Sequence, residues 1–363
     1  MTAEQPDVPE VRKGQTYESL SKEEFAKRFD ARFYDPAFDY LRDELARIRD
    51  VAWDGYHEYR KSPRTRPAGA GFADPTFALP IEWLETRDQI IDAQKRHANA
   101  AAQRRVLVIC ASPRTDATCP GEMSKTFRLA QLARQIVEGD DQCECDFLDL
   151  SALTAEYGRV IYPCKGCVST AMPLCHWPCS CYPNHAMGQT GDWMNELYPR
   201  WVAAHAVMIV TPVHWYQAPS VLKLMIDRLV CADGGNPDPT STHGKKPEEA
   251  KALEVKGWPY PKHLAGRAFG VFVHGDAVGA ETVRRSLTDW LLDMELVQAG
   301  RGVVDRYIGY MENYANSHHA LDADSAVQED VRNVAREVVA TVKLMRSGRY
   351  DDPAQGINDP RPK

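Results

Sequence analysis

The chain has 363 residues, of which 44% are hydrophobic, and carries a formal net charge of −7. This length and composition allow a substantial apolar core in one large or two smaller domains. A negative charge without a stripe of clustered lysines and arginines argues against nucleic acid or an anionic membrane as partner. No apolar run reaches membrane-spanning length and the acidic start lacks the pattern of a secretory signal, so we expect a cytoplasmic protein.

Several helical patterns lie within residues 1–103, which we interpret as a helical N-terminal extension. Ser21 and Glu24 form a capping box before a short helix, and an amphipathic pattern over residues 36–59 predicts a longer one. A further helical pattern includes residues 84–91. Their apolar stripes must be covered, so we expect these helices to pack on the rest of the chain or on a second subunit. A purely structural role and a role in covering a ligand site both stay open.

Strand and helix patterns alternate over residues 104–346, before a C-terminal tail at 347–363. Such alternation predicts an α/β fold with a doubly wound, five-stranded parallel sheet in the order 2-1-3-4-5. The expected strands are 105–110, 143–150, 206–210, 267–274 and 296–304. The clearest helices are expected at 279–294 and at 325–345, and in the latter valines recur at helical spacing.

A polar loop follows the first strand and leads into a helix. It contains Ser112 and Arg114, while Ser124 and Thr126 stand at the expected helix start, with Lys125 between them. Hydroxyls, a guanidinium and backbone N–H groups at a helix N-terminus together bind phosphate. Because the glycine-rich fingerprint of dinucleotide sites is missing, the pattern favours a mononucleotide phosphate. An ordinary capped helix is the alternative interpretation.

An aromatic loop follows the third strand, at Pro212, Val213, His214, Trp215 and Tyr216. The first and third strands flank the topological switch point, where ligands bind beyond the carboxyl ends of the strands, so both loops should open into one crevice. We expect a planar, electron-carrying ring to lie on this loop. Alternatively, its Trp and Tyr only fill core space.

The loop after the fourth strand, His274, Gly275 and Asp276, should reach the same crevice. Its glycine permits close approach to the edge of a ring. Contact with the ligand and a satisfied core histidine are both compatible with the position of His274.

Five cysteines crowd into the loop at residues 163–185, namely Cys164, Cys167, Cys175, Cys179 and Cys181. In a chain without an export signal the thiols are expected to be reduced, so the cluster indicates metal binding or redox activity rather than a disulfide framework. A long insertion rich in Gly, Pro and Asp occupies residues 231–264. Loops of this length are usually functional or disordered, and we expect a lid or an oligomer contact.

Taken together, these segments resemble the NAD(P)H-dependent FMN reductase family of flavodoxin-like proteins, including its iron–sulfur flavoprotein branch. The resemblance lies in residues 111–114, 124–126, 211–215 and 226–228. It implies that Ser112, Arg114, Ser124 and Thr126 hold the FMN phosphate, and that residues 212–216 line the isoalloxazine ring. The chain departs from the family pattern at Ala111, Lys125 and His214. Lys125 adds positive charge near the expected phosphate, whereas Ala111 leaves less room for backbone approach.

The iron–sulfur branch carries a compact Cys-x-x-Cys-x-x-Cys followed by a more distant cysteine. Cys164 and Cys167 match its first two ligands, Thr170 occupies the third position, and Cys175 matches the fourth. Cys179 or Cys181 would have to replace the missing ligand. A [4Fe–4S] cluster, a zinc ion and no metal at all stay open as alternatives.

The resemblance implies an enzyme that moves hydride from NAD(P)H to FMN and onward to a quinone-like or other conjugated acceptor, and that is a homo-oligomer. The chemistry belongs to the cofactor, and we assign no side chain as nucleophile, acid or base. Two alternatives are an iron–sulfur flavoprotein that relays single electrons, and a regulatory or assembly protein that has borrowed the fold.

Overall fold

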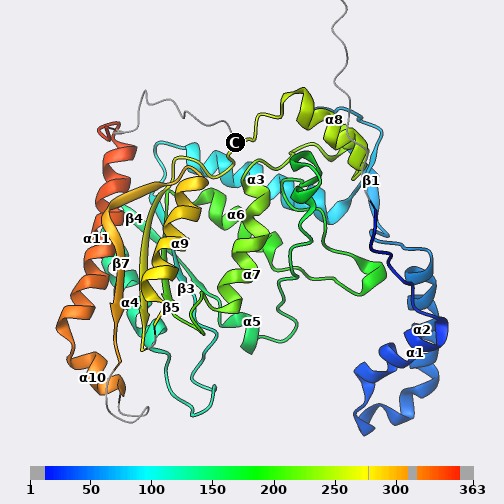
Figure 1. The fold of residues 1–363 in the computed structure, drawn as a ribbon, viewed down its shortest axis with the longest axis horizontal. Helices are drawn as coiled ribbons and strands as arrows, with labels where there is room; N and C mark the ends of the chain where they lie inside the picture. The colour runs from blue at the N-terminus through cyan, green and yellow to red at the C-terminus, as the bar shows by residue number, and fades with distance from the viewer. Residues whose placement is uncertain (1–12, 277, 310–316, 352–363) are drawn as a thin grey trace, which may run out of the picture. The chain divides into compact units, whose positions relative to one another are not determined.

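The computed structural model describes residues 13–276, 278–309 and 317–351 (Figure 1). The chain divides into two compact units. Unit 1 comprises Met1–Asp88, Val160–Asn195 and Arg228–Pro261, and unit 2 comprises Gln89–Arg159, Glu196–Asp227 and Lys262–Lys363. The cysteine-rich loop and most of the insertion at 231–264 thus group with the N-terminal region. The domain boundary that the sequence predicts between residues 103 and 104 stays a prediction. No described helix is long and apolar enough to cross a membrane.

Unit 2 is built on a parallel sheet of five strands, ordered β4-β3-β5-β6-β7. In chain order this is 2-1-3-4-5, which confirms the predicted flavodoxin-like topology. The strands are Arg104–Cys110 (β3), Cys143–Asp149 (β4), Ala206–Pro212 (β5), Ala268–Gly275 (β6) and Val297–Tyr307 (β7). β5 and β6 are buried along their whole length. Each has a neighbouring strand on both sides, and both faces of each strand are covered, as its run of apolar residues predicts.

Helices pack on this sheet. Lys125–Glu138 (α4) and Ser325–Arg346 (α11) share one apolar cluster with the strands, to which α11 contributes valines on a single face. Ala280–Asp293 (α9) packs against β6 and β7 and lies in front of the strands in Figure 1. The remaining helices of the unit are Ala152–Ala155 (α5), Met194–Ala203 (α6), Ser220–Arg228 (α7), Ser317–Ala323 (α10) and the end of Ile81–Ala98 (α3).

Unit 1 has less regular structure. From residue 13 onward, its helices are Lys22–Asp30 (α1), Arg42–His57 (α2), the start of α3, and Pro247–Gly257 (α8). Two short strands in the same described part, Thr65–Pro67 (β1) and Ala78–Pro80 (β2), are antiparallel. Six described 3₁₀ helices lie at Ala31–Phe33, Pro36–Leu41, Cys167–Ser169, Met172–Leu174, His185–Met187 and Pro239–Thr242, and a seventh at Leu229–Ala232 follows α7. The insertion is tied to the N-terminal region by side chains. Asp238 and Thr240 accept hydrogen bonds from the backbone N–H groups of Ala73 and Asp74, at 2.7 and 3.0 Å.

The N-terminal helices confirm one prediction and correct another. Ser21 caps α1 and accepts a hydrogen bond from the N–H of Glu24 at 3.1 Å, as the capping box predicts. The helix expected over residues 36–59 is instead a 3₁₀ helix followed by α2, and its apolar stripe is not buried as a whole. Leu45 and Tyr56 are buried, whereas Ile48 is 56% exposed.

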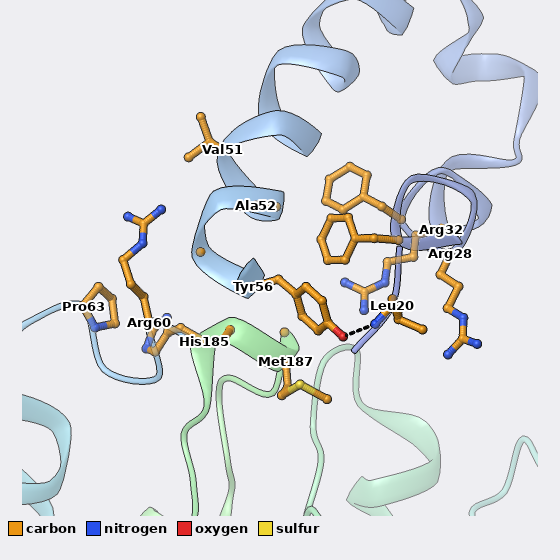
Figure 2. A pocket seen from close by; sticks show the side chains of 15 residues that line it. Leu20, Arg28, Arg32, Val51, Ala52, Tyr56, Arg60, Pro63, His185 and Met187 are labelled. Atoms are coloured by element: carbon orange, nitrogen blue, oxygen red, sulfur yellow. Dashed lines mark hydrogen bonds between the residues drawn. The ribbon is translucent and has the colours of Figure 1, made fainter. Parts of the chain in front are cut away.

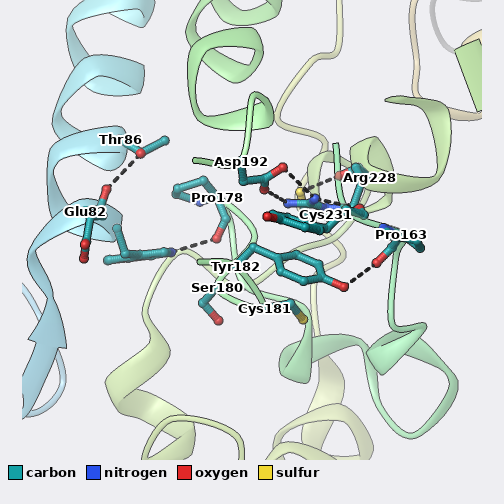
Figure 3. A network of polar contacts seen from close by, with 12 residues as sticks. Glu82, Thr86, Pro163, Pro178, Ser180, Cys181, Tyr182, Asp192, Arg228 and Cys231 are labelled. Carbon is teal, nitrogen blue, oxygen red and sulfur yellow. Dashed lines mark hydrogen bonds and ion pairs between the residues drawn. The ribbon is translucent and has the colours of Figure 1, made fainter. Parts of the chain in front are cut away.

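A buried ion pair organises the interior of unit 1 (Figure 3). The guanidinium of Arg228 donates to Asp192 at 2.5 Å, and both side chains are fully buried. Arg228 also donates to the carbonyl of Tyr162 and stacks on the ring of Tyr182, 4.7 Å from its centroid. The hydroxyl of Tyr182 in turn donates to the carbonyl of Pro163 at 2.7 Å, so the pair fixes the entry to the cysteine-rich loop.

Candidate functional site

A cavity of about 200 Å³ opens in unit 2 beyond the carboxyl ends of β3, β5 and β6. All the residues expected to contact flavin line it except Trp215 and Tyr216. The lining consists of Ser112, Arg114, Ser124, Lys125, Thr126, Pro212, Val213, His214, His274, Gly275, Asp276 and Ile308. Three loops that are far apart in sequence therefore meet because the parallel strands present their carboxyl ends at one edge. Ile308 was missed by the sequence analysis, although its position directly after β7 could have indicated it.

Buried hydroxyls form one end of the cavity. Ser124 caps α4, and its hydroxyl donates to the hydroxyl of Ser112 at 3.0 Å. The Ser112 hydroxyl also accepts from the backbone N–H of Arg114 at 3.2 Å. Both serines and Thr126 are buried. The first turn of α4 directs backbone N–H groups and the positive end of the helix dipole to this place, so the donor set suits an anion.

Two cations stand at the same end. The guanidinium of Arg114 is anchored by the carbonyls of Cys119 and Thr118, at 3.2 and 3.4 Å. Burial lowers the pKa of Lys125, against the opposing influence of Asp276 and Glu122. An anion bound here would favour the ammonium form of Lys125 and reverse that shift.

The Thr126 hydroxyl forms a hydrogen bond with Nε2 of His274 at 2.9 Å. Complete burial, together with the positive charge of Lys125 and the ring of His214, lowers the pKa of His274 to about 3. The imidazole is therefore neutral at pH 7. The sequence left open whether His274 contacts a ligand or is a satisfied core histidine. In the structure its ring is buried and hydrogen-bonded, and it also lines the cavity.

The aromatic turn lies at the rim of the cavity rather than in its lining. Trp215 and Tyr216 have φ angles of 47° and 67° and are 92% and 58% exposed. The turn is closed by hydrogen bonds between the backbones of His214 and Gln217, both at 2.9 Å. Gly279 approaches it closely, since a Cβ on that residue would lie 3.0 Å from Cα of Tyr216. The two rings thus do not fill core space, and they stand free to contact a ligand.

The sequence profile of the NADPH-dependent FMN reductase family matches residues 104–305, more than half of the chain. The chain belongs to this family. It is accordingly a flavin-dependent oxidoreductase, and FMN and NAD(P)H are the cofactors of this family. No curated protein is similar enough in sequence to match the chain.

Solved structures that resemble this member of the family share little sequence with it. RosB, with a bound 8-demethyl-8-formylriboflavin-5'-phosphate intermediate, has 13% identity over 68% of this chain and 82% of its own, with a TM-score of 0.47. An apo NADH:FMN oxidoreductase has 13% identity over 69% and 92% of the two chains, with a TM-score of 0.37. A flavone reductase has 13% identity over 69% and 67%, with a TM-score of 0.39. The family assignment depends on the profile match and not on these structures.

The cysteine-rich loop gathers its thiols in unit 1. Sγ of Cys167 lies 3.6 Å from Sγ of Cys181, and Nζ of Lys245 lies 3.3 and 2.9 Å from these sulfurs. Hydrogen bonds from Cys175 and Cys181, with the charge of Lys245, hold the pKa of Cys167 well below its usual range. Within residues 13–276, 278–309 and 317–351, no group of three or more His, Cys, Asp or Glu residues is arranged to hold a metal ion. A cluster or zinc at Cys164, Cys167, Cys175, Cys179 and Cys181 thus lacks structural support.

A second cavity, of about 440 Å³, lies in unit 1 between α1, α2 and the 3₁₀ helix at His185–Met187 (Figure 2). Its walls are mainly apolar, and Tyr56 accepts a hydrogen bond there from the N–H of Leu20 at 2.8 Å. Arg28 and Arg60 also line it, but each pairs with a nearby glutamate, at 2.9 and 3.0 Å. These pairs partly neutralise the charges of Arg28 and Arg60, and a third guanidinium, that of Arg32, also lines the cavity.

Proposed function

We propose that the chain holds FMN in the cavity of unit 2, takes hydride from a reduced nicotinamide, and delivers the electrons to a quinone-like or other conjugated acceptor. The observation that carries this proposal is the convergence of three hydroxyls, two cations and a helix N-terminus beside an exposed aromatic turn. Phosphate at one end and a flat ring at the other are the two parts of FMN that need these partners.

The residues present fit the phosphate. Ser112, Ser124 and Thr126 offer hydroxyls, and Arg114 and Lys125 balance the charge. Arg114 holds its guanidinium with backbone carbonyls, so little conformational freedom remains to be lost on binding. Gly275 allows close approach of the chain at the cavity wall, since a Cβ there would lie 3.1 Å from Cβ of Val213.

Bound FMN supplies the hydride-accepting and electron-donating chemistry. The chain positions it. His214 is exposed as a residue, but its ring is partly desolvated at the cavity wall and lies near Arg114. Both effects lower the pKa of His214, so its imidazole is neutral at pH 7. A neutral ring can donate one N–H to negative charge that develops beside it. Trp215 and Tyr216 offer apolar faces to the nicotinamide and to the acceptor, and no side chain is assigned as nucleophile, acid or base.

Comparison of FMN with riboflavin tests the phosphate end directly. We expect wild type to bind FMN more tightly than riboflavin, and Arg114→Ala to weaken FMN binding about 10- to 100-fold, because a charge-assisted hydrogen bond contributes about 1.5–3 kcal/mol. Riboflavin affinity should be unchanged by this substitution. Arg134→Ala is the matched control, since it also removes an arginine but lies near the C-terminal end of α4, at the opposite end of that helix from the expected phosphate. Equal losses for both ligands, or no loss for FMN, would contradict the proposed phosphate site.

Stopped-flow reduction separates the enzyme from an electron carrier. We expect anaerobic addition of NADPH or NADH to bleach the bound flavin rapidly, and a quinone to restore its absorption. Trp215→Ala should slow reoxidation by the acceptor more than it weakens FMN binding, because the ring stands at the rim. A flavin that neither nicotinamide reduces would contradict the proposed activity.

A further inference from the structure

Lys245 lies between two sulfur atoms in unit 1. Its Nζ donates to Sγ of Cys181 at 2.9 Å and to Sγ of Cys167 at 3.3 Å, and the two sulfurs are 3.6 Å apart. These three residues come from the insertion and from two ends of the cysteine-rich loop. The sequence therefore gives no local pattern for this arrangement, and nothing in the flavin site requires it.

The charge of Lys245 needs compensation. Among the described residues, no carboxylate forms an ion pair with Lys245. A second ammonium, that of Lys61, donates to the carbonyl of Ser180 nearby, and the positive charges of Lys61 and Lys245 repel each other. A largely desolvated cation requires a negative partner, and the thiols that touch it supply one when they are ionised.

The two sulfurs differ in access. Cys181 is buried, with 6% of its surface exposed, whereas Cys167 is half-buried at the start of a 3₁₀ helix. A small oxidant therefore reaches Cys167 first, and Cys181 is placed to react with the sulfenic acid that forms there. Cys175 also forms a hydrogen bond with Cys167, but this bond and burial hold the pKa of Cys175 well above its usual range, so its sulfur stays a thiol. Both belong to short or irregular segments, so the approach from 3.6 Å to the disulfide distance of about 2.05 Å does not disrupt a long helix or a strand.

We propose that Cys167 and Cys181 form a redox-active dithiol that reduces hydroperoxides, with Lys245 as the residue that positions and charge-balances the two sulfurs. The Cys167 thiolate attacks the terminal oxygen of R–O–O–H, so that an S–O bond forms, the O–O bond breaks, and RO⁻ leaves and takes a proton from solvent. The Cys181 thiolate then attacks the sulfur of the sulfenic acid; an S–S bond forms and hydroxide leaves. Two sulfurs lose two electrons in total and the peroxide gains them. An external dithiol restores the reduced pair.

The test uses full-length, anaerobically purified protein, reduced, desalted and treated with one equivalent of hydrogen peroxide. We expect the loss of two thiols, an intact mass lower by two hydrogens, and a single cross-linked peptide that joins Cys167 to Cys181. In Cys181→Ser the cross-link should be absent and a sulfenic acid at Cys167 should be trapped by dimedone. Cys119→Ser, which removes an exposed thiol of unit 2, is the matched control and should react like wild type.

Substitution of Lys245 tests the role of the charge. Lys245→Met should slow thiol loss about tenfold, and Lys245→Arg should restore most of the rate, because nucleophilicity follows thiolate content. Three results would overturn the proposal: cross-links that join other cysteines, thiols that resist peroxide in folded wild type, or stoichiometric iron or zinc bound to these sulfurs. The wild-type peptide map decides the matter even if a variant fails to fold.

Discussion

The neutral, buried imidazole of His274 makes folding stability depend on pH in a way that can be calculated. Its pKa is lowered to about 3 by burial and the neighbouring positive charge, whereas a histidine in the unfolded chain titrates near 6.5. Between these values the unfolded state binds more protons than the folded state. Stability from this group is therefore fully present above pH 6.5 and is lost as the pH falls toward 3. By pH 5 the loss is about 2 kcal/mol.

His274→Gln removes this titration and keeps a polar partner for the Thr126 hydroxyl. We expect the fall in free energy of unfolding from pH 7 to pH 5 to be smaller by about 2 kcal/mol in the variant than in wild type. Urea unfolding at the two pH values measures it, on flavin-free protein because a bound ligand adds its own stabilisation. Burial also lowers the pKa values of His97 and His205 to about 4. Both residues are present in wild type and in the variant, so their contributions cancel in the comparison.

His319→Gln is the control, because His319 is exposed and its substitution therefore removes no buried imidazole. It should show the wild-type pH dependence. A variant at His274 that loses stability between pH 7 and pH 5 as steeply as wild type would refute the reasoning, because the ring would then not be held neutral by the fold.

Three further predictions concern stability and are checked by urea or thermal unfolding at pH 7. Asp192→Ala should cost about 3–5 kcal/mol, because it leaves the charge of Arg228 buried without its carboxylate; a loss below about 1 kcal/mol would show that water reaches the pair. Gly270→Ala should cost about 1–3 kcal/mol, since its Cβ would lie 2.7 Å from a methyl of Val338, and an unchanged midpoint would mean that the helix shifts freely. Ser124→Ala should cost about 1 kcal/mol through loss of the α4 cap and should also weaken FMN binding; a stability loss with unchanged FMN affinity would limit this serine to capping.

The fold of unit 2 follows from local patterns, and these were legible in the sequence. Runs such as that of β5 are apolar on both faces, and the turn chemistry after each strand is local. Because the order of a doubly wound sheet brings particular carboxyl ends together, the cavity residues Arg114 and His274 could be grouped from the sequence alone. What was missed at this site, Ile308, is an apolar residue with no chemical signature.

Unit 1 was poorly predicted because its structure depends on contacts between distant segments. The backbone of residues 73 and 74 is held by side chains of the insertion, and the position of Lys245 among the thiols follows from the same packing. No periodicity records such contacts. The prediction that the apolar stripe over residues 36–59 is buried was wrong for a related reason. Amphipathic spacing indicates which residues could be buried together, but it does not indicate which other segment covers them.

The unbroken pairing of β5 with its two neighbours bears on how this enzyme can acquire new substrates. Cys110 is level with Val210, and Pro212 is level with His274, in continuous parallel register. A slip of one residue would move every side chain of a strand to the opposite face of the sheet, so the backbone hydrogen bonds of β5 fix the spacing between the loops that follow β3, β5 and β6. The turn at residues 214–217 lies beyond those hydrogen bonds and is exposed. We expect acceptor preference to be re-engineered by exchange of Trp215 and Tyr216 alone, because His214 lines the cavity and these two residues do not.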